Sequence, residues 1–536
     1  MKRTLLALAL CSPLLAACGS STAADTNDDD LIVGEGKEDN FFSSSAREYT
    51  FTGKATVTIE EALANKSAAE KLRRVKELIP LRSLAISWFL NSYLIDKEEK
   101  DANADYGGFG ALVRFSSEET SEPKALDART FEFAYAVQAA GSPTLGRRLG
   151  GSIDLEVGKP SNAEMADLTF NSEWYREAPW EDWDPSKVSA DQKETIKLAV
   201  AAQARTNDAY LAYDRLLADG KITVGVHFGW DYHSRADISG SRNLYNHLVR
   251  EGFKSPVASY EKLLRTSGPL TKTIQSNGKP IKIEVSIFHP GDASQNVPGP
   301  DPDTDEGGKV LEADMRDSFA NREVIMFEGH SGPLYGFALA NWKKTEEGDL
   351  DDSKIAGLQM PKTYQIVLAN GCDTYALGQA FWNNPAKADQ QSLNIITTTS
   401  FSNAETDASA RRLLKALYNQ SYGKLVPVKV SELTAGLDSD QGWGFTTMFG
   451  VYGVDANPKY DPMSDASKLC QSCSANSDCG ADGNRCTKIK TGVKACTIGC
   501  IDDTGCPSNY ACRSVASATS STIKTKQCVP VSLSCR

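Results

Sequence analysis

Short apolar runs and amphipathic stretches alternate through the middle of the chain. The apolar runs have the length of β-strands and lie at 221–228, 281–288, 324–327, 364–369 and 393–400. Between them, apolar residues recur every three or four positions, as on one face of a helix, in 244–253, 310–319 and 408–418. Strands that alternate with helices predict an α/β fold, in which a mostly parallel sheet carries helices on both faces.

The hydrophobic pattern is different before residue 180. Its apolar runs predict a β-hairpin over 47–59 that turns at Gly53, a helix through 72–79, and strands at 108–115 and 130–138. We therefore expect an α+β domain over 41–180. It carries no visible chemistry, which fits a pro-segment that covers a site, or an adhesive or positioning module.

A helix is expected to bridge these two regions within 181–220. Ser189 and Gln192 have the spacing of a capping box, and Gly220 is a typical C-terminal stop.

The N-terminus indicates export. Residues 1–17 combine a basic start, a short apolar run and small residues before Cys18, as in a secretory signal peptide. LAAC, ending at Cys18, resembles the bacterial lipoprotein signal, which implies cleavage before Cys18, acylation of its thiol and a lipid anchor. Gly19, where aspartate would indicate retention at the inner membrane, favours the outer membrane or surface of a Gram-negative bacterium. An ordinary signal peptide with an incidental cysteine is the alternative.

The mature chain is expected to be tethered to the membrane without spanning it. Residues 18–40 are polar and acidic, as in a flexible tether, and no later run approaches the ~20 apolar residues of a membrane span. The formal net charge of −12 argues against nucleic acid as a partner, because binding to phosphates needs a basic face. The length of 536 residues favours two or three domains.

Cysteine is concentrated at the C-terminus. Ten of the thirteen cysteines lie in 466–536, where their spacing repeats once: Cys470, Cys473, Cys479, Cys486, Cys496, Cys500, Cys506, Cys512, Cys528 and Cys535. An even number in an exported segment predicts up to five disulfides, whose pairing stays open. Zinc is the competing interpretation, but an oxidising compartment and irregular spacing disfavour it. The expected role of this module is attachment or binding of a surface partner.

Two apolar strands end beside reactive side chains. FEGHSG places His330 after the run at 324–327, and ANGCDTY places Cys372 after the run at 364–369. The carboxyl ends of neighbouring parallel strands meet at one edge of a sheet, so imidazole and thiol are predicted to lie side by side. That pair suffices for nucleophilic catalysis. A buried inert cysteine and a core histidine are the alternative.

This stretch resembles the catalytic core of the caspase and gingipain superfamily of cysteine peptidases, in which one apolar strand ends in His and a small residue, and the next in a small residue and the nucleophilic Cys. The resemblance covers 221–465 and implies a caspase-like sheet, catalysis by His330 and Cys372 without a cofactor, and peptide or protein substrates. It also implies an oxyanion hole of backbone N–H groups at Ser331 and Cys372. Ser331 stands where the family usually has glycine.

Cleavage specificity is not readable from the sequence. Some relatives that cut after basic residues carry a carboxylate two places before the nucleophile, where this chain has Asn370. Asp231, after the first strand of the core, is a candidate for the wall of the specificity pocket. A non-catalytic surface protein that keeps the fold as a scaffold is the alternative function, and an adhesin acting through 41–180 is a third.

Other candidate sites were weighed on spacing. Carboxylates with the spacing of an EF-hand calcium loop stand at Asp301, Asp303, Asp305 and Glu312, although Glu306 replaces the usual glycine, and a solvated acidic loop is the alternative. Among the five histidines, we expect His227 and His247 in the core and His233 and His289 in solvated loops. Lining of a cleft is the alternative for His233 and His289. No His-x-x-x-His pair or nucleophile elbow indicates a zinc or serine hydrolase.

Overall fold

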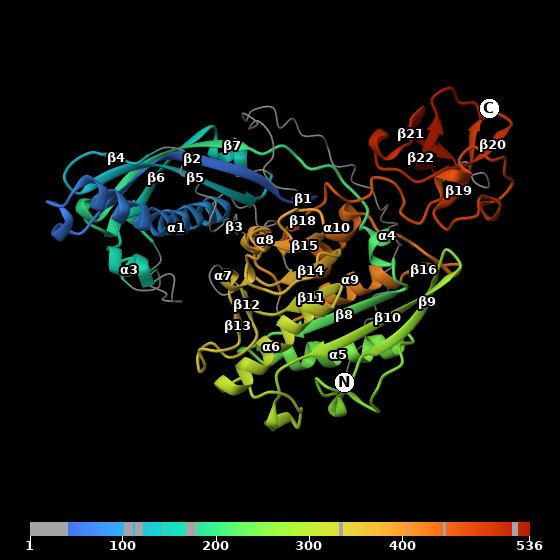
Figure 1. The fold of residues 1–536 in the computed structure, drawn as a ribbon, viewed down its shortest axis with the longest axis horizontal. Coiled ribbons are helices and arrows are strands. Elements are labelled where there is room, and N and C mark those ends of the chain that lie inside the picture. The colour runs from blue at the N-terminus through green and yellow to red at the C-terminus, as the bar shows by residue number, and fades with distance from the viewer. Residues whose placement is uncertain are drawn as a thin grey trace, which may run out of the picture.

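The computed structural model describes residues 41–100, 111–112, 122–143, 145–167, 178–181, 183–331, 336–403, 405–442, 446–516 and 524–535. The predicted signal peptide, Cys18 and the acidic tether therefore lie outside the described residues. Figure 1 shows an N-terminal sheet with its long helix, a central α/β part and a C-terminal module. Within the described residues, no helix combines the length and apolarity that a membrane span needs.

A large sheet forms the centre of the described chain. Its strand order is β1-β18-β15-β14-β11-β8-β10-β9. The strands are β1 (Phe42–Ser43), β8 (Lys221–Phe228), β9 (Leu270–Ser276), β10 (Lys279–Phe288), β11 (Val324–Glu328), β14 (Gln365–Asn370), β15 (Leu393–Thr398) and β18 (Phe449–Tyr452). The inner run from β15 to β10 is parallel, and β1, β18 and β9 pair antiparallel at its two edges.

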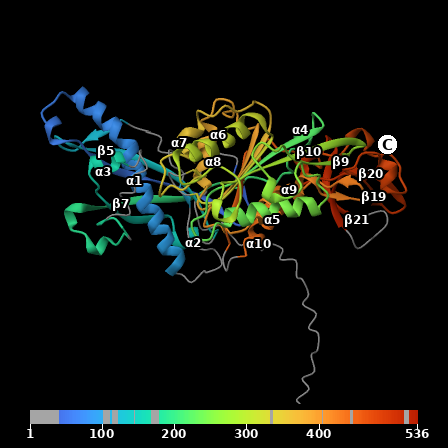
Figure 2. The ribbon, with the colours of Figure 1, turned by 90° about the horizontal axis from the view of Figure 1, so that it is seen from below.

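Helices cover both faces of this sheet (Figure 2). One face packs on α5 (Ala236–Arg250), α9 (Ala408–Tyr418) and α10 (Val430–Asp440), and the other on α6 (Asp305–Asn321) and α8 (Tyr375–Trp382). Strand β11 shows why its apolar run is continuous: Met326 is buried in the first core and Phe327 in the second. The predicted α/β fold with a largely parallel sheet is confirmed.

Small elements fill the connections of this α/β part. They are α4 (Tyr213–Leu216), α7 (Asp352–Ile355), the pair β12 (Phe337–Ala338) and β13 (Asp349–Leu350), and the pair β16 (Gln420–Ser421) and β17 (Lys424–Leu425).

The N-terminal part forms a separate antiparallel sheet under one long helix. The order is β3-β5-β2-β7-β6, with β4 also paired to β5. Its elements are β2 (Arg47–Thr58), β3 (Ala111–Leu112), β4 (Lys124–Ala125), β5 (Thr130–Gly141), β6 (Ser152–Gly158), β7 (Lys193–Ala202), α1 (Ala68–Lys100), α2 (Leu145–Leu149) and α3 (Asn162–Asp167). Apolar residues of α1 and of the sheet share one core.

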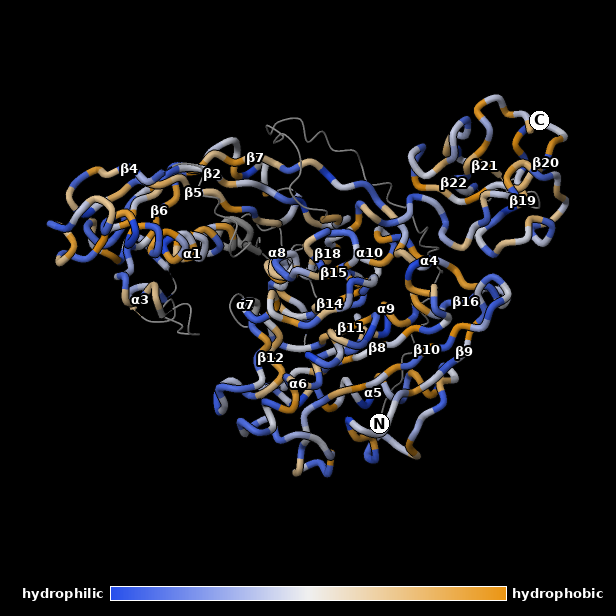
Figure 3. Tube along the Cα trace, viewed as in Figure 1, coloured by the Kyte–Doolittle hydropathy of each residue, from blue (hydrophilic) through white to orange (hydrophobic). Residues whose placement is uncertain are grey.

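The predicted bridging helix within 181–220 is wrong. Residues Lys193–Ala202 form strand β7, which pairs with β2 and β6. Figure 3 shows hydrophobic and hydrophilic residues alternating along these strands, and Ile196, Leu198 and Val200 are buried at every second position. This period of two outweighs the capping signal at Ser189, which produces only a 3-10 turn over Ala190–Gln192.

The predicted hairpin over 47–59 is also wrong, because β2 continues straight through Gly53. A Cβ at Gly53 would lie 2.5 Å from the Lys197 carbonyl oxygen on β7, so the glycine marks a close approach between strands. Two boundaries change as well. Strand β7 belongs to the N-terminal sheet, which moves its end past the predicted residue 180, and β1 belongs to the central sheet.

The C-terminal module is disulfide-rich, as predicted. It consists of two hairpins, β19 (Asn484–Lys490) with β20 (Val493–Ile498) and β21 (Tyr510–Ala516) with β22 (Lys524–Pro530). The bridges are Cys473–Cys486, Cys479–Cys496, Cys500–Cys512, Cys506–Cys528 and Cys470–Cys535. Both repeats join their first cysteine to the third and their second to the fourth, so the repeat in spacing corresponds to a repeat in structure.

Candidate active site

The ends of β11 and β14 bring His330 and Cys372 to the same edge of the central sheet. The two strands run parallel with Glu328 opposite Asn370, and His330 and Cys372 each stand two residues further on. The backbone N–H of Gly329 donates to the Asn370 carbonyl at 3.1 Å, which extends the pairing beyond the strands.

Gly371 is required for this closeness. A Cβ at Gly371 would lie 2.4 Å from the Ser331 Cβ and 3.2 Å from the Ser331 backbone nitrogen. The chain after β11 therefore passes directly against the residue before Cys372. The Ser331 hydroxyl donates to the Gly336 carbonyl at 2.5 Å, which fixes the orientation of its side chain.

A buried carboxylate holds His330. Asp231 follows β8, which is the other neighbour of β11, and its Oδ1 lies 2.9 Å from His330 Nε2. Its Oδ2 accepts from the backbone N–H groups of Ser234 and Ala236, each at 3.0 Å. Burial disfavours a charged carboxylate, but these bonds outweigh it and hold the pKa of Asp231 well below its usual range.

Asp231 therefore cannot line a specificity pocket, contrary to our expectation. Its side chain is only 2% exposed and faces the histidine. Because Nε2 of His330 is used by Asp231, the nitrogen left for chemistry is Nδ1, which bonds no protein atom within the described residues.

Aromatic rings surround His330. The Tyr232 ring stacks on His330 with centroids 4.6 Å apart, and Trp342 meets the imidazole edge-on at 5.6 Å. Lys343 places its ammonium 4.4 Å from the Tyr232 ring, and Trp230 contacts Trp342 at 5.5 Å. This cage restricts the orientation of the imidazole and excludes water from one of its faces.

Cys372 is partly buried and is the one free cysteine of the described residues. Its Sγ lies 3.9 Å from the Ser402 carbonyl oxygen, and no hydrogen bond joins it to His330 within the described residues. Burial raises the pKa of the Cys372 thiol to about 11, and the charge of the neighbouring Asp373 adds to the shift. In the resting arrangement the sulfur is therefore a thiol.

Asn370 lies inside the sheet and does not line a pocket. Its Nδ2 donates to Glu328 Oε2 at 2.5 Å, and Glu328 Oε1 accepts from the Ala410 backbone N–H at 2.5 Å. Burial raises the pKa of Glu328 to about 8. This polar pair ties β11, β14 and the first turn of α9 together beneath the two reactive side chains.

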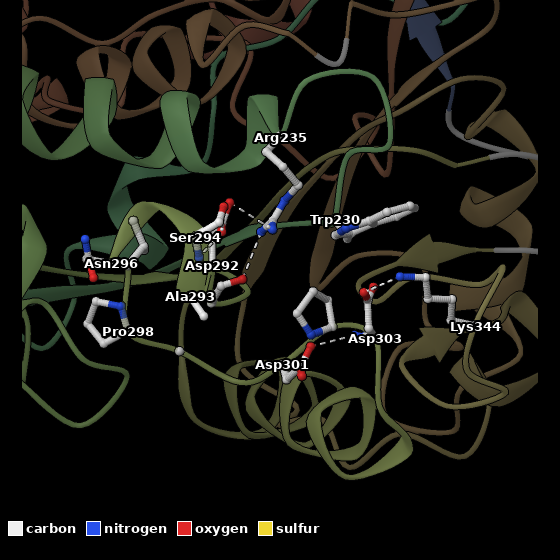
Figure 4. Close-up of a pocket in the computed structure, with 14 residues that line it drawn as sticks. Trp230, Arg235, Asp292, Ala293, Ser294, Asn296, Pro298, Asp301, Asp303 and Lys344 are labelled. Carbon is white, nitrogen blue, oxygen red and sulfur yellow. Dashed lines mark hydrogen bonds and ion pairs between the residues drawn. The ribbon is translucent and has the colours of Figure 1, made fainter.

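A hollow of about 900 Å³ opens beside the aromatic cage (Figure 4). Trp230 belongs to both, so the hollow begins next to the site. Figure 4 shows Arg235 reaching toward Asp292 and Lys344 paired with Asp303 across the hollow. Its walls thus present charged side chains that are already paired, next to one large aromatic surface.

The four carboxylates of the predicted calcium loop do not converge. Helix α6 begins at Asp305, so Glu312 stands two turns inside a helix, where it binds Arg316 at 2.6 Å. Asp301 caps the backbone N–H of Asp303, and Asp303 binds Asn341 and Lys344. Asp305 bonds Thr345. Helix formation separates ligands that a calcium loop would have wrapped around one ion.

The remaining histidines divide by burial. His227 is buried, stacks on Phe288 at 4.5 Å and bonds the Ser318 hydroxyl, and burial lowers its pKa to about 3. His247 is half-buried on α5. His289, expected in solvent, is buried, and its ring lies 5.2 Å from that of Tyr260.

Sequence reasoning missed three contributions to the site. These are the bond between Asp231 and His330, the cage of Tyr232 and Trp342, and the position of His233, whose Nδ1 lies 3.3 Å from Asp231 Oδ1. The rule that located His330 and Cys372, polar residues directly after buried parallel strands, also applies to the sequence after 221–228 and could have found Asp231.

Comparison with known proteins gives no further assignment, since the sequence matches no family model and no curated protein and the fold matches no solved structure.

Proposed function

We propose that this chain is a cysteine endopeptidase whose α/β part is a caspase- or gingipain-like domain. The observation that supports it best is that β11 and β14 end at the same register position, with Glu328 opposite Asn370. His330 and Cys372 therefore lie at one sheet edge, beside the charged, buried Asp231. A carboxylate that orients the imidazole is typical of a catalytic histidine and is not required for a histidine that only packs in the core.

The chemistry follows from three groups. Asp231 accepts a hydrogen bond from Nε2–H of His330, which keeps the proton on Nε2, so that Nδ1 carries a lone pair and can take the proton of the Cys372 thiol. The sulfur then attacks the peptide carbonyl, and His330 returns the proton to the leaving amine before water releases the acyl group. Backbone N–H groups of Ser331 and Cys372 are the proposed donors to the oxyanion. No metal or cofactor takes part.

The resting thiol makes activation dependent on substrate. With a pKa of about 11, the Cys372 sulfur carries little charge near neutral pH. A bound peptide that brings Sγ and His330 Nδ1 together would allow direct proton transfer between them, so the nucleophile forms only when its target is present.

The place of action is proposed from the N-terminus. Lipidation at Cys18 would anchor the peptidase at the outer membrane or cell surface, where peptides and proteins are its substrates. The disulfide module is a candidate for binding a surface partner, because its crosslinked hairpins resist unfolding outside the cell.

A non-catalytic surface protein is the second candidate. It is favoured by the burial of Cys372 and by the missing hydrogen bond between its sulfur and His330. On this interpretation the α/β part is only a scaffold, and the N-terminal or C-terminal part binds a surface partner.

A peptidyl probe that reacts with catalytic thiols separates the two. The peptidase should be labelled at Cys372, and Cys372→Ala should abolish the label. His330→Ala should slow labelling strongly, whereas His247→Ala, half-buried on α5 and outside the site, should not. Equal labelling of wild type and Cys372→Ala would contradict the proposed peptidase activity. A wild-type protein that is not labelled and cleaves no member of a peptide library would also contradict it.

A further inference from the structure

A second histidine shares the carboxylate that holds His330. Asp231 Oδ1 faces His330 Nε2 at 2.9 Å and His233 Nδ1 at 3.3 Å. Each of the three residues offers one ligand atom, and these three atoms lie within 4.8 Å of one another. The proposed peptidase chemistry needs only the first of these contacts, so His233 is unexplained by it.

The spacing of these atoms is that of metal ligands. Zinc binds imidazole nitrogen and carboxylate oxygen at about 2.0–2.2 Å, so two ligand atoms of a tetrahedral site lie about 3.3–3.6 Å apart. The 3.3 Å contact of Asp231 Oδ1 with His233 Nδ1 has that length, and the 2.9 Å contact with His330 Nε2 would lengthen slightly when an ion enters. Two imidazoles and one carboxylate are also a donor set that zinc accepts readily.

Neighbouring residues fix the orientation of the three side chains. Asp231 is fixed by the backbone N–H groups of Ser234 and Ala236 on its other oxygen. The Tyr232 ring packs on both imidazoles, 4.6 Å from His330 and 3.9 Å from His233. Such outer contacts orient ligands before an ion arrives.

Solvent can reach the site from one side. The side chain of His233 is 55% exposed, that of His330 18% and that of Asp231 2%. An ion would therefore enter at His233 and leave one position open to water. Three protein ligands with an open fourth position occur in zinc sites that solvent can reach, such as catalytic ones, whereas structural sites are closed.

We propose that Asp231, His233 and His330 bind one zinc ion, and that this binding reversibly switches off the peptidase. The second half rests on the proposed function, and the first half does not. The ligands come from the loops after β8 and β11, so their spacing in sequence differs from the His-x-x-x-His pattern of helical zinc sites.

The inhibition follows from where the protons go. Zinc takes the lone pairs of His330 Nε2 and His233 Nδ1, and their protons move through solvent to the opposite ring nitrogens. Neutral imidazoles then bind with no net release of protons. His330 Nδ1 now carries a hydrogen and has no lone pair, so it cannot accept the proton of the Cys372 thiol. Chelation of the zinc reverses each step.

Zinc binding can be measured without activity. Untagged Cys372→Ala protein with its disulfides intact is titrated with zinc against a chromophoric chelator at pH 7.5. We expect one equivalent to bind, and His233→Ala to weaken its affinity by at least about 10- to 100-fold, the loss known for contacts that merely support ligands. His247→Ala is the matched control and should bind as the parent does.

The outcomes separate the two proposals. One equivalent that is lost in His233→Ala supports the site, even if the wild-type chain cleaves no peptide. Absence of a bound equivalent, or affinity that is equal in His233→Ala, overturns the site. If the wild type is an active peptidase, micromolar zinc should inhibit it, chelator should restore it, and His233→Ala should need at least tenfold more zinc. Inhibition at the same zinc concentration in both proteins overturns the switch.

Discussion

At the residue scale, two buried carboxyl groups near the site differ in protonation: Asp231 is ionised, whereas the protonated form of Glu328 is favoured. Asp231 is charged, because one imidazole and two backbone N–H groups outweigh the cost of its burial. Glu328 lies deeper and has two partners, the Asn370 amide and the Ala410 N–H, so burial dominates and favours its protonated form. The charged group is the one that faces the reactive histidine.

Asp231→Asn should damage turnover far more than substrate binding. The amide keeps the shape of the side chain but neither favours the Nε2–H tautomer of His330 nor stabilises its imidazolium. We expect kcat to fall by about 10²- to 10⁴-fold with KM nearly unchanged. Steady-state kinetics on a cleaved peptide measures both. Asp317→Asn, an exposed carboxylate on α6, is the control; an unchanged kcat in Asp231→Asn would remove the positioning role.

Glu328→Gln should change how stability depends on pH. The folded pKa of about 8 lies above the unfolded value near 4.5, so the folded protein holds the proton more tightly. The contribution of Glu328 to the free energy of unfolding is complete below pH 4.5. It is lost as pH rises to 8, by at most about 1.4 kcal/mol per pH unit. Glutamine does not titrate, and its amide can pair with Asn370 after that amide turns.

The test for Glu328 is urea unfolding of both proteins at pH 5, 6, 7 and 8. The difference between Glu328→Gln and wild type should shift steadily in favour of the variant as pH rises. Because all other titrating groups are common to both proteins, their contributions cancel in this difference. Two curves that stay parallel would show that Glu328 is ionised in the folded state.

At the element scale, the site depends on how closely the loops after β11 and β14 approach. Gly371 leaves room for Ser331, and the pair formed by Glu328 and Asn370 ties the two strands beneath them. Helix α8 begins at Tyr375, just after Cys372, and packs on the same face as α6. Cys372 thus lies between the end of β14 and the start of α8.

Gly371→Ala should push these two strand ends apart. Its Cβ would overlap the Ser331 Cβ, and overpacking of this kind costs about 1–3 kcal/mol. We expect lower urea stability and slower labelling of Cys372. Adding Ser331→Gly removes the clashing Cβ and should restore part of both losses. A double variant no better than Gly371→Ala would place the damage elsewhere than at this contact.

At the scale of the whole molecule, the three parts are joined differently. The N-terminal part is joined to the central α/β part through residues 41–48. Strand β1 pairs with β18, and Phe41 packs on Tyr375 and Tyr452. Glu48 accepts a hydrogen bond from the Tyr375 hydroxyl. The C-terminal module is attached mainly by polar contacts, including the reciprocal pair in which Asn277 and Asp482 each donate a backbone N–H to the other side chain at 2.8 Å.

Reduction should therefore open the C-terminal module and spare the central sheet. The apolar clusters of the module are small, and two of the three are built largely from the bridged cysteines. Each bridge contributes about 2–4 kcal/mol. After mild reduction, limited proteolysis should remove the region beyond residue 465 and leave a fragment that still labels at Cys372. A module that stays resistant, or a central domain that is digested together with it, would contradict this division.

Features that depend on local periodicity could be predicted from the sequence alone. Continuous apolar runs and amphipathic stretches predicted the parallel sheet with helices on both faces, because a strand buried on both sides has no polar face to show. The even, repeated cysteines predicted a disulfide module, and the residues after two strands predicted that His330 and Cys372 share one edge. Each inference needs only a few consecutive residues.

Contacts between residues far apart in sequence were set by the tertiary structure. Residues 193–202 alternate in burial as a strand does, and their pairing with β2 and β6 places them in the N-terminal sheet in spite of a local helix-start signal. The carboxylates after residue 300 diverge because a helix begins among them. Asp231 lies 99 positions from His330, and no local pattern specifies that bond. Sequence periodicity fixes which face of an element is buried, whereas the atoms that meet there are fixed by how the elements pack.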